Sequence, residues 1–272
     1  MASVTPSAVD AVAIIGAGAS GLAAARYLQC EAAFSTIAVF EQRGAVGGLW
    51  NATPDMSGTL QALDGRPAAA PVSWHDGEAR FASPVHDGLE TNIPHSLMRF
   101  SDLAFPDGTA LLPRHHVVRE YLERYADVAD VRRLVRLGVQ VLVVQPVADG
   151  RGRWAVTVRD LRTRDESTIV FDAVVVASGH FDSPFVPDVP GIREWQAAYP
   201  EAISHSMSYR RPGAYRDKAS AAARPSTPPY STDAAPRRSS LWATPHRASI
   251  SPSKSRPCRG ICSSLNETPR RG

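Results

Sequence analysis

The first forty residues contain apolar runs of two different kinds. Residues 12–15 are a short run of valine, alanine and isoleucine, which is typical of a buried strand. After a glycine-rich turn, residues 22–28 are rich in alanine and leucine and favour a helix, and residues 36–40 form a second strand-like run. This order predicts a strand–helix–strand unit, which places its two strands parallel in one sheet.

The later hydrophobic pattern extends this unit. Residues 114–128 place apolar side chains at three- and four-residue spacing between charged ones, which predicts an amphipathic helix. Residues 52–90 carry many glycines and prolines and are expected to be loop-like. The expected fold class is therefore α/β, with a parallel sheet wound as a Rossmann-type domain. Further strands are expected at residues 137–144, 154–158, 169–171 and 173–177.

The turn between the first strand and the helix has the pattern Gly-x-Gly-x-x-Gly. Gly16 allows a tight turn, Gly18 lets the backbone approach a pyrophosphate, and Gly21 lets helix and strand pack closely. Glu41 ends the second strand, where a carboxylate accepts hydrogen bonds from a ribose diol. A glycine-rich turn without a ligand is the alternative, but the complete order favours a dinucleotide site. The candidate residues of the turn are Gly16, Ala17, Gly18, Ala19, Ser20 and Gly21.

A second glycine cluster follows Glu41 within a few residues. Gly47 and Gly48 remove side chains where the backbone must pass close to another group, and Trp50 offers a broad flat surface. Taken alone, this cluster is equally consistent with an ordinary loop that carries one core tryptophan.

Together, the first motif, Glu41 and the Gly47-Gly48-Leu49-Trp50 cluster resemble the flavin-containing monooxygenases. The resemblance implies that FAD, rather than NADPH, occupies the first glycine turn and that the Gly-Gly-x-Trp segment runs along the flavin. It also implies an FAD- and NADPH-dependent reaction that inserts one oxygen atom of O2 into a soft nitrogen or sulfur nucleophile through a flavin C4a-hydroperoxide. The further cofactor-binding residues that it implies here are Glu41, Gln42, Gly48, Leu49 and Trp50.

Later segments fit the same family. Residues 91–98 resemble its Thr-Asn-x-Pro-x-x-x-Met segment, which implies that Asn92 lies near the reactive edge of the flavin as a catalytic and cofactor-binding residue. From spacing alone, Asn92 would be a turn residue before a proline. The resemblance also implies that Val141 contacts the FAD adenine. Ser178 stands where the family has the threonine of an Ala-Thr-Gly segment, and it keeps the hydroxyl.

A fingerprint that follows is only partly matched. The family pattern is Phe-x-Gly-x-x-x-His-x-x-x-Phe/Tyr, and His205 and Tyr209 stand at the expected spacing. Tyr199 and Glu201 replace the phenylalanine and the glycine, and Glu201 lacks the conformational freedom of a glycine.

Composition argues against several other classes of protein. A net charge of +3 over 272 residues does not indicate nucleic-acid binding, and no apolar run is long enough to span a bilayer. Cys30, Cys258 and Cys262 form neither a disulfide framework nor a metal-ligand spacing, so we expect no metal and a cytoplasmic location. The first ten residues lack the pattern of a secretory leader. The absence of a Cys-x-x-C pair argues against a disulfide reductase.

The family pattern stops near Lys218. A strand and a second glycine-rich turn for NADPH should follow, but residues 219–272 are rich in Ser, Pro and Arg and hold nine Lys or Arg against two acidic residues. We expect residues 1–218 to form the FAD-binding domain and residues 219–272 to be a disordered tail. A frameshift, a retained intron or a wrong gene model would explain the break, and the chain is then an inactive fragment. The alternatives are a non-catalytic FAD-binding fragment with a basic interaction tail and a flavin reductase or oxidase.

Overall fold

The computed structural model describes residues 9–53, 73–75, 78–181, 185–187, 189–199 and 203–215. The chain divides into two units, Met1–Arg211 and Pro212–Gly272. The tail predicted at residues 219–272 lies outside the described residues, and its disorder stays a prediction.

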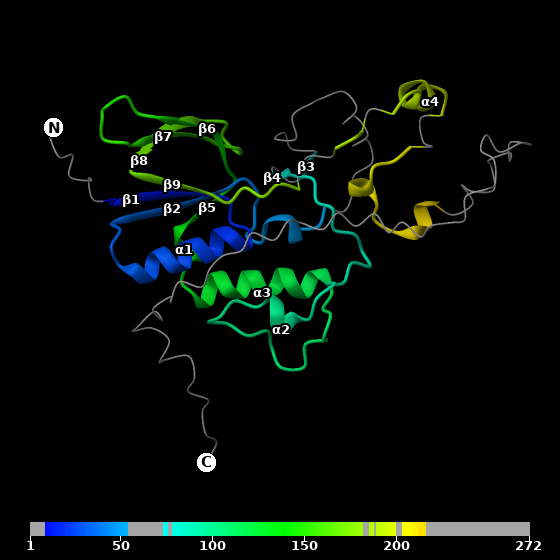
Figure 1. The fold of residues 1–272 in the computed structure, drawn as a ribbon, viewed down its shortest axis with the longest axis horizontal. Helices are drawn as coiled ribbons and strands as arrows, with labels where there is room; N and C mark the ends of the chain where they lie inside the picture. Colours follow the sequence, from blue (N-terminus) through cyan, green and yellow to red (C-terminus); the bar gives the residue numbers. More distant parts are fainter. Residues whose placement is uncertain are drawn as a thin grey trace, which may run out of the picture. The chain divides into compact units, whose positions relative to one another are not determined.

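The first unit is organised around a parallel sheet (Figure 1). Its described strands are β1 (Ala11–Ile15), β2 (Thr36–Glu41), β5 (Val135–Leu137) and β9 (Ala173–Val176), in the spatial order β5-β2-β1-β9. β1 pairs with β2 on one side, with Ile14 opposite Val39, and with β9 on the other. The expected α/β class with a parallel sheet is therefore confirmed.

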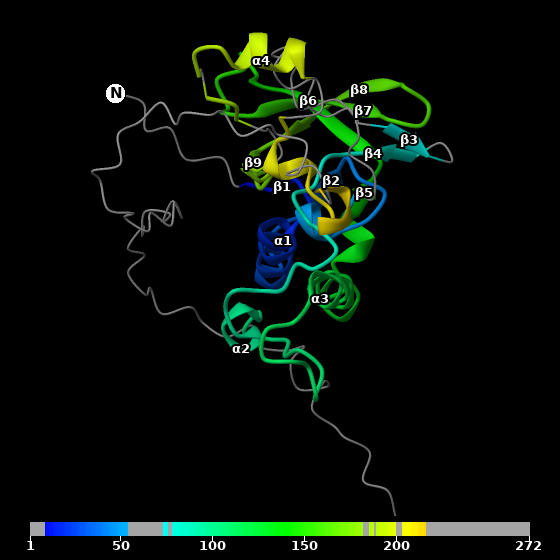
Figure 2. The ribbon, with the colours of Figure 1, turned by 90° about the vertical axis from the view of Figure 1, so that its right-hand side faces the viewer.

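Alternation along β1 and β2 decides which layer each side chain enters. Ile14 and Val39 point toward helices α1 (Ala19–Glu31) and α3 (His115–Val128), where they join a buried cluster with Leu22. Figures 1 and 2 show both helices on the same side of the sheet. Because these side chains are almost inaccessible to water, this layer holds much of the hydrophobic core.

The neighbouring residues on the same strands point to the opposite face. Ala13 and Phe40 pack against an antiparallel sheet, where Phe40 meets Phe171 edge to face at a ring-centroid distance of 6.0 Å. This second sheet has the order β6-β7-β8 in the described part of the chain (Figure 1). Its strands are β6 (Val139–Pro146), β7 (Trp154–Asp160) and β8 (Glu166–Phe171).

The remaining described elements are short. They are η1 (Gly48–Trp50), β3 (Ser73–His75), β4 (Glu78–Arg80), α2 (His95–Met98), η3 (Arg132–Leu134), α4 (Ile192–Ala198), η4 (Ser206–Ser208) and, in the second unit, η5 (Pro212–Tyr215). None of the described helices is long and apolar enough to cross a membrane.

Two sequence-based assignments need correction. Residues 52–90 were expected to be loop-like, but the described part of that range contains the antiparallel pair β3 and β4. β5 was not predicted separately. All three strands are only three residues long, which is too short for an alternation of apolar and polar positions to stand out. The longer elements, such as the helix at residues 114–128, are confirmed to within a few residues.

Candidate functional site

A cavity of about 560 Å³ opens at the carboxyl ends of β1, β2 and β9. This is where the strand order reverses around β1, the place at which open α/β sheets bind ligands. Among the residues proposed from sequence, those that line the cavity are Gly16, Gly18, Ala19, Ser20, Glu41, Gln42, Gly48, Leu49, Trp50, Val141 and Ser178.

Three proposed residues do not line this cavity. Ala17 is fully buried and Gly21 is buried within α1, so both support the loop from behind. Asn92 is exposed, in the bend that precedes α2. The structure therefore brings the residues of the two glycine clusters together, with Val141 and Ser178, and leaves Asn92 apart from them.

The first glycine turn is packed too tightly for side chains at two of its positions. Gly16 has a φ of +99°, and a Cβ on it would lie 2.5 Å from the carbonyl oxygen of Ala177. A Cβ on Gly21 would lie 1.8 Å from the carbonyl oxygen of Gly16. The Gly16 amide also donates to the carbonyl of Phe40 at 2.8 Å, so the turn joins the carboxyl ends of β1, β2 and β9.

The two glycine clusters touch through their backbones. The Gly47 amide donates to the Ala17 carbonyl at 2.9 Å. Gly48 has a φ of +56°, and a Cβ there would lie 3.0 Å from the Cα of Gly18. The second cluster is therefore more than an ordinary loop, because its glycines allow it to form one wall of the cavity.

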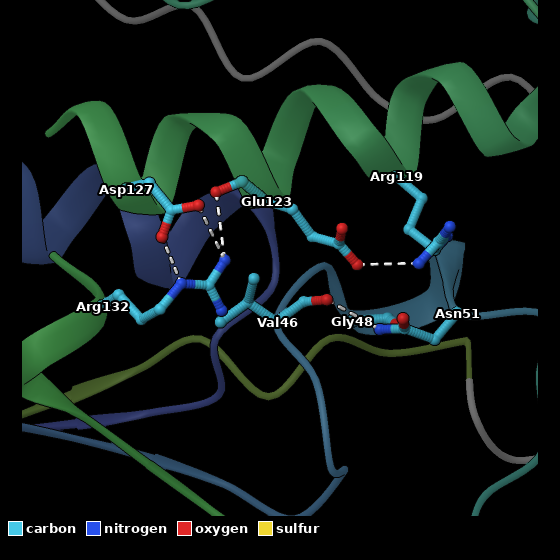
Figure 3. A network of polar contacts seen from close by, with 7 residues as sticks. All are labelled: Val46, Gly48, Asn51, Arg119, Glu123, Asp127 and Arg132. Atoms are coloured by element: carbon cyan, nitrogen blue, oxygen red, sulfur yellow. Dashed lines mark hydrogen bonds and ion pairs between the residues drawn. The ribbon is translucent and has the colours of Figure 1, made fainter.

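Asn51 holds this second loop in shape, and sequence reasoning missed it. Its Nδ2 donates to the carbonyl oxygens of Val46, at 2.9 Å, and Gly48, at 3.1 Å. Figure 3 shows α3 lying along the loop that carries these residues. The available signal was an amide side chain directly after the Gly-Gly-Leu-Trp sequence.

The adjoining face of α3 is itself tied by ion pairs (Figure 3). Arg119 Nη1 and Glu123 Oε1 are 2.7 Å apart, and Arg132 pairs with Asp127 and donates to the Glu123 carbonyl at 3.2 Å. The aliphatic part of Arg119 and the side chain of Leu122 would both lie within 4.0 Å of a Cβ at Gly47. The helix thus supports the loop mainly by packing, since its ion pairs are partly exposed.

Glu41 is a buried carboxylate at the end of β2. Its Oε2 accepts from the Ala17 amide at 2.8 Å and its Oε1 from the Arg43 amide at 2.9 Å. Burial raises the pKa of Glu41 above its ordinary value, although the two amide hydrogen bonds oppose the shift. Each oxygen has a second lone pair, so the carboxylate can also accept from a ligand in the cavity that it lines.

We expect Glu41 to make the chain less stable as the pH rises above 4.5, its ordinary pKa. Because the folded pKa is raised, the stabilisation from protonation is complete below the unfolded pKa and is lost as the pH rises through the folded pKa. The Glu41→Gln variant should lack this component. Urea unfolding of both chains over roughly pH 4 to 7 measures it, and parallel stability curves would contradict the assignment.

Two further groups in the site were not predicted. The guanidinium of Arg43 donates to the carbonyls of Phe81, at 3.2 Å, and Ala82, at 2.9 Å, and so fixes a wall segment of the cavity. Gln140, on β6, is buried and donates to the side-chain oxygen of Gln42 at 3.4 Å. Neither lies in a recognisable motif, because each acts through a partner that is far away in the sequence.

The start of α1 is suited to an anion. The helix begins at Ala19, and the preceding Gly18 provides no capping side chain. The first turn contains no acidic residue. Its amides and the positive end of the helix dipole are therefore available to a phosphate at the cavity, which Gly18, Ala19 and Ser20 line.

The histidine of the partly matched fingerprint has a local role. His205 precedes η4, and its Nδ1 accepts from the Met207 amide at 3.1 Å. Its Nε2 lies 3.2 Å from the carbonyl of Phe185 and must be the donor, because Nδ1 is the acceptor. His205 does not line the cavity.

Comparison with known proteins places this geometry in a family. A family model described as flavin-binding monooxygenase-like matches residues 73–221, and one described as an NAD(P)-binding Rossmann-like domain matches residues 14–79. A flavin-containing monooxygenase of Arabidopsis thaliana, GS-OX-like 6, is 35% identical over 206 residues, covering 73% of this chain and 40% of that protein. The Aspergillus flavus flavin-containing monooxygenase ustF2 is 31% identical, covering 76% of this chain and 48% of that protein.

Comparison with solved structures points to the same family. The S-allyl-L-cysteine S-oxygenase of Allium sativum superposes with a TM-score of 0.60 at 32% identity, covering 76% of this chain and 44% of that one. Tmm from Pelagibacter sp. strain HTCC7211 also gives 0.60, at 23% identity and the same coverage, which shows the shared fold. This chain spans less than half the length of these relatives. The resemblance drawn from the glycine clusters is confirmed, and the chain belongs to the flavin-binding monooxygenase-like family.

Proposed function

We propose that the cavity binds FAD and that this chain is the flavin-binding part of an NADPH-dependent monooxygenase. The observation that carries the proposal is the meeting of the two glycine clusters around one cavity that Glu41 also lines. The reaction would insert one oxygen atom of O2 into a soft nitrogen or sulfur atom of a small molecule. Relatives named as monooxygenases support this reaction, and one similar structure is named as an S-oxygenase.

Different residues of the cavity would bind different parts of FAD. Gly18 and the first amides of α1 would hold the pyrophosphate, and Glu41 would accept from the ribose hydroxyls. Val141, on β6, would contact the adenine, and Leu49 and Trp50 would lie along the flavin. The bound flavin supplies the redox chemistry, while the protein binds it, orients it and excludes water.

The proposal assigns Ser178 and Asn92 to the flavin end of the site. Ser178 lines the cavity beside the end of β9. The role of Asn92 rests on the family resemblance, since the residue is exposed and does not line the cavity. The proposal includes a cytoplasmic location, because a chain with only three cysteines fits a reducing compartment. It also includes an FAD-binding domain that ends near Lys218.

A nicotinamide dinucleotide in the same cavity is the second candidate. It is favoured by the match of residues 14–79 to an NAD(P)-binding Rossmann-like domain, and both cofactors share an adenine, a ribose and a pyrophosphate. Titration of the purified chain with FAD and with NADPH separates the two. We expect FAD to bind at least about tenfold more tightly. Tighter binding of NADPH would reverse the assignment.

We also expect the FAD-loaded chain to be unable to use NADPH at a meaningful rate. The sequence contains no second Gly-x-Gly-x-x-Gly turn, and positioning of the reactants supplies roughly 7–11 kcal/mol of such a reaction's barrier in favourable cases. The measurement is anaerobic mixing with NADPH while the flavin absorbance is followed. Reduction by dithionite is the control that the bound flavin is reducible. Rapid, saturable bleaching by NADPH would contradict this expectation and would mean that either the role of residues 219–272 or the cofactor of the first glycine turn is assigned wrongly.

A further inference from the structure

One wall of the cavity is held in place without being part of a sheet. Ala82 and Pro84 line the cavity, and the segment Phe81–Ser83 belongs to no strand or helix. Its carbonyl groups are bound by side chains from elsewhere in the chain. Arg43 binds those of Phe81 and Ala82, and Thr53 Oγ1 donates to that of Phe81 at 2.5 Å. Because the segment has no ladder hydrogen bonds, these side chains are the partners that its carbonyl groups need.

Arg210 binds this segment from a distant part of the sequence. Its Nη2 donates to the carbonyl of Ser83 at 2.9 Å, and its Nε donates to that of Thr53 at 2.6 Å. Its Nη1 donates to the carbonyls of Met207 and Tyr209, both at 2.8 Å, which holds the guanidinium against its own segment. The planar fork of an arginine can reach several carbonyls at once, which a lysine cannot do.

The same junction is closed by contacts next to Arg210. The Asp87 amide donates to the Arg210 carbonyl at 3.0 Å, so Arg210 binds this segment through its backbone as well as its side chain. The rings of His86 and Tyr209 meet edge to face at 5.2 Å. Arg210 is therefore the centre of a junction between residues 83–87 and residues 207–210.

Ser83 links this junction to residues that line the cavity. Its Oγ donates to the carbonyl of Leu49 at 2.5 Å, and Leu49 belongs to η1 in the second glycine cluster. The path from Arg210 thus runs through Ser83 to both Leu49 and Pro84, which line the cavity. Arg210 itself does not line it.

We propose that Arg210 is a positioning residue for the cofactor cavity: it fixes the wall at residues 81–84 and, through Ser83, the Leu49–Trp50 side on which the flavin would lie. The assignment rests on the proposed FAD site for its functional consequence, but the positioning of the wall can be measured without FAD. This proposal gives the segment around His205 and Tyr209 a physical role, because Arg210, which follows Tyr209, binds that segment to the cavity wall.

The test compares Arg210→Met, Arg210→Lys and, as a control, Arg211→Met in the full chain. Arg211 is the next residue and is exposed, so its replacement removes one charge without the carbonyl contacts. FAD affinity is measured by quenching of flavin fluorescence. Deuterium uptake of a peptide covering residues 81–89 is measured without FAD, and urea unfolding reports global stability.

We expect Arg210→Met to bind FAD at least about tenfold more weakly and to exchange faster at residues 81–89. Arg210→Lys should fall between it and the wild type, and Arg211→Met should match the wild type. Wild-type affinity and wild-type exchange in Arg210→Met would overturn the proposal. If the wild-type chain fails to bind FAD, the proposed function falls, and the exchange data alone decide the role of Arg210.

A second variant tests the path through Ser83. Ser83→Ala removes the hydroxyl that donates to the Leu49 carbonyl and accepts from the Val85 amide, but it leaves the Ser83 carbonyl for Arg210. We expect it to weaken FAD binding, and to add little to the effect of Arg210→Lys on FAD affinity, because both act along one path. Full additivity of the two effects on FAD affinity would overturn the path through Ser83.

Discussion

Replacing Gly21 with alanine is expected to lower the free energy of unfolding by roughly 3 kcal/mol. The added Cβ would lie 1.8 Å from the carbonyl oxygen of Gly16, which is backbone and cannot turn aside as a side chain could. To make room, α1 must move away from β1 and disturb the core around Leu22. Urea unfolding followed by circular dichroism measures the loss.

The matched control is Gly18→Ala. A Cβ at Gly18 would lie 3.7 Å from the Cα of Gly48, an ordinary contact, and the φ of Gly18 is −73°. We expect this variant to stay within about 1 kcal/mol of the wild type. Equal stability of the alanine variants at Gly18 and Gly21 would mean that the close contact between α1 and the first turn is absent.

Replacing Gly18 with leucine is expected to weaken FAD binding by at least about a hundredfold while the chain stays folded. The backbone at Gly18 accepts a side chain, but a leucine would extend between the two glycine clusters into the cavity that Gly18 lines. It would also keep a pyrophosphate away from the amides at the start of α1. Loss of the yellow chromophore from the purified chain, with an unchanged urea midpoint, is the expected pair of results.

Two control variants test whether the effect depends on the size of the added side chain and on its position in the chain. Gly18→Ala should lose less FAD affinity than Gly18→Leu, because a methyl group extends less far toward the pyrophosphate. Gly213→Leu adds the same bulk where a Cβ meets no atom within 4 Å, and it should bind FAD normally. Flavin retained at full occupancy in Gly18→Leu would show that FAD does not use the first glycine turn.

The sequence by itself determined the features that depend on local chemistry. The strand-forming run at residues 12–15, the glycines that follow it and the acid at position 41 lie within a short stretch of chain, so their spacing defines a nucleotide-binding unit. The amphipathic spacing of residues 114–128 likewise gave the helix α3. These features were sufficient to identify the fold class, and the Gly47-Gly48-Leu49-Trp50 cluster beside them identified the family.

Only the tertiary structure decided which segments meet at the cavity. The contact of Gly48 with Gly18 and the binding of Ser83 and Thr53 by Arg210 join residues that are far apart along the chain. No local period records such pairs, because they form only when the helices and the second sheet pack on opposite faces of the parallel sheet and bring distant loops to one edge. For the same reason the structure assigned Asn51, Gln140 and Arg210 their contacts, and it placed Asn92 on the surface, where the sequence pattern alone could not put it.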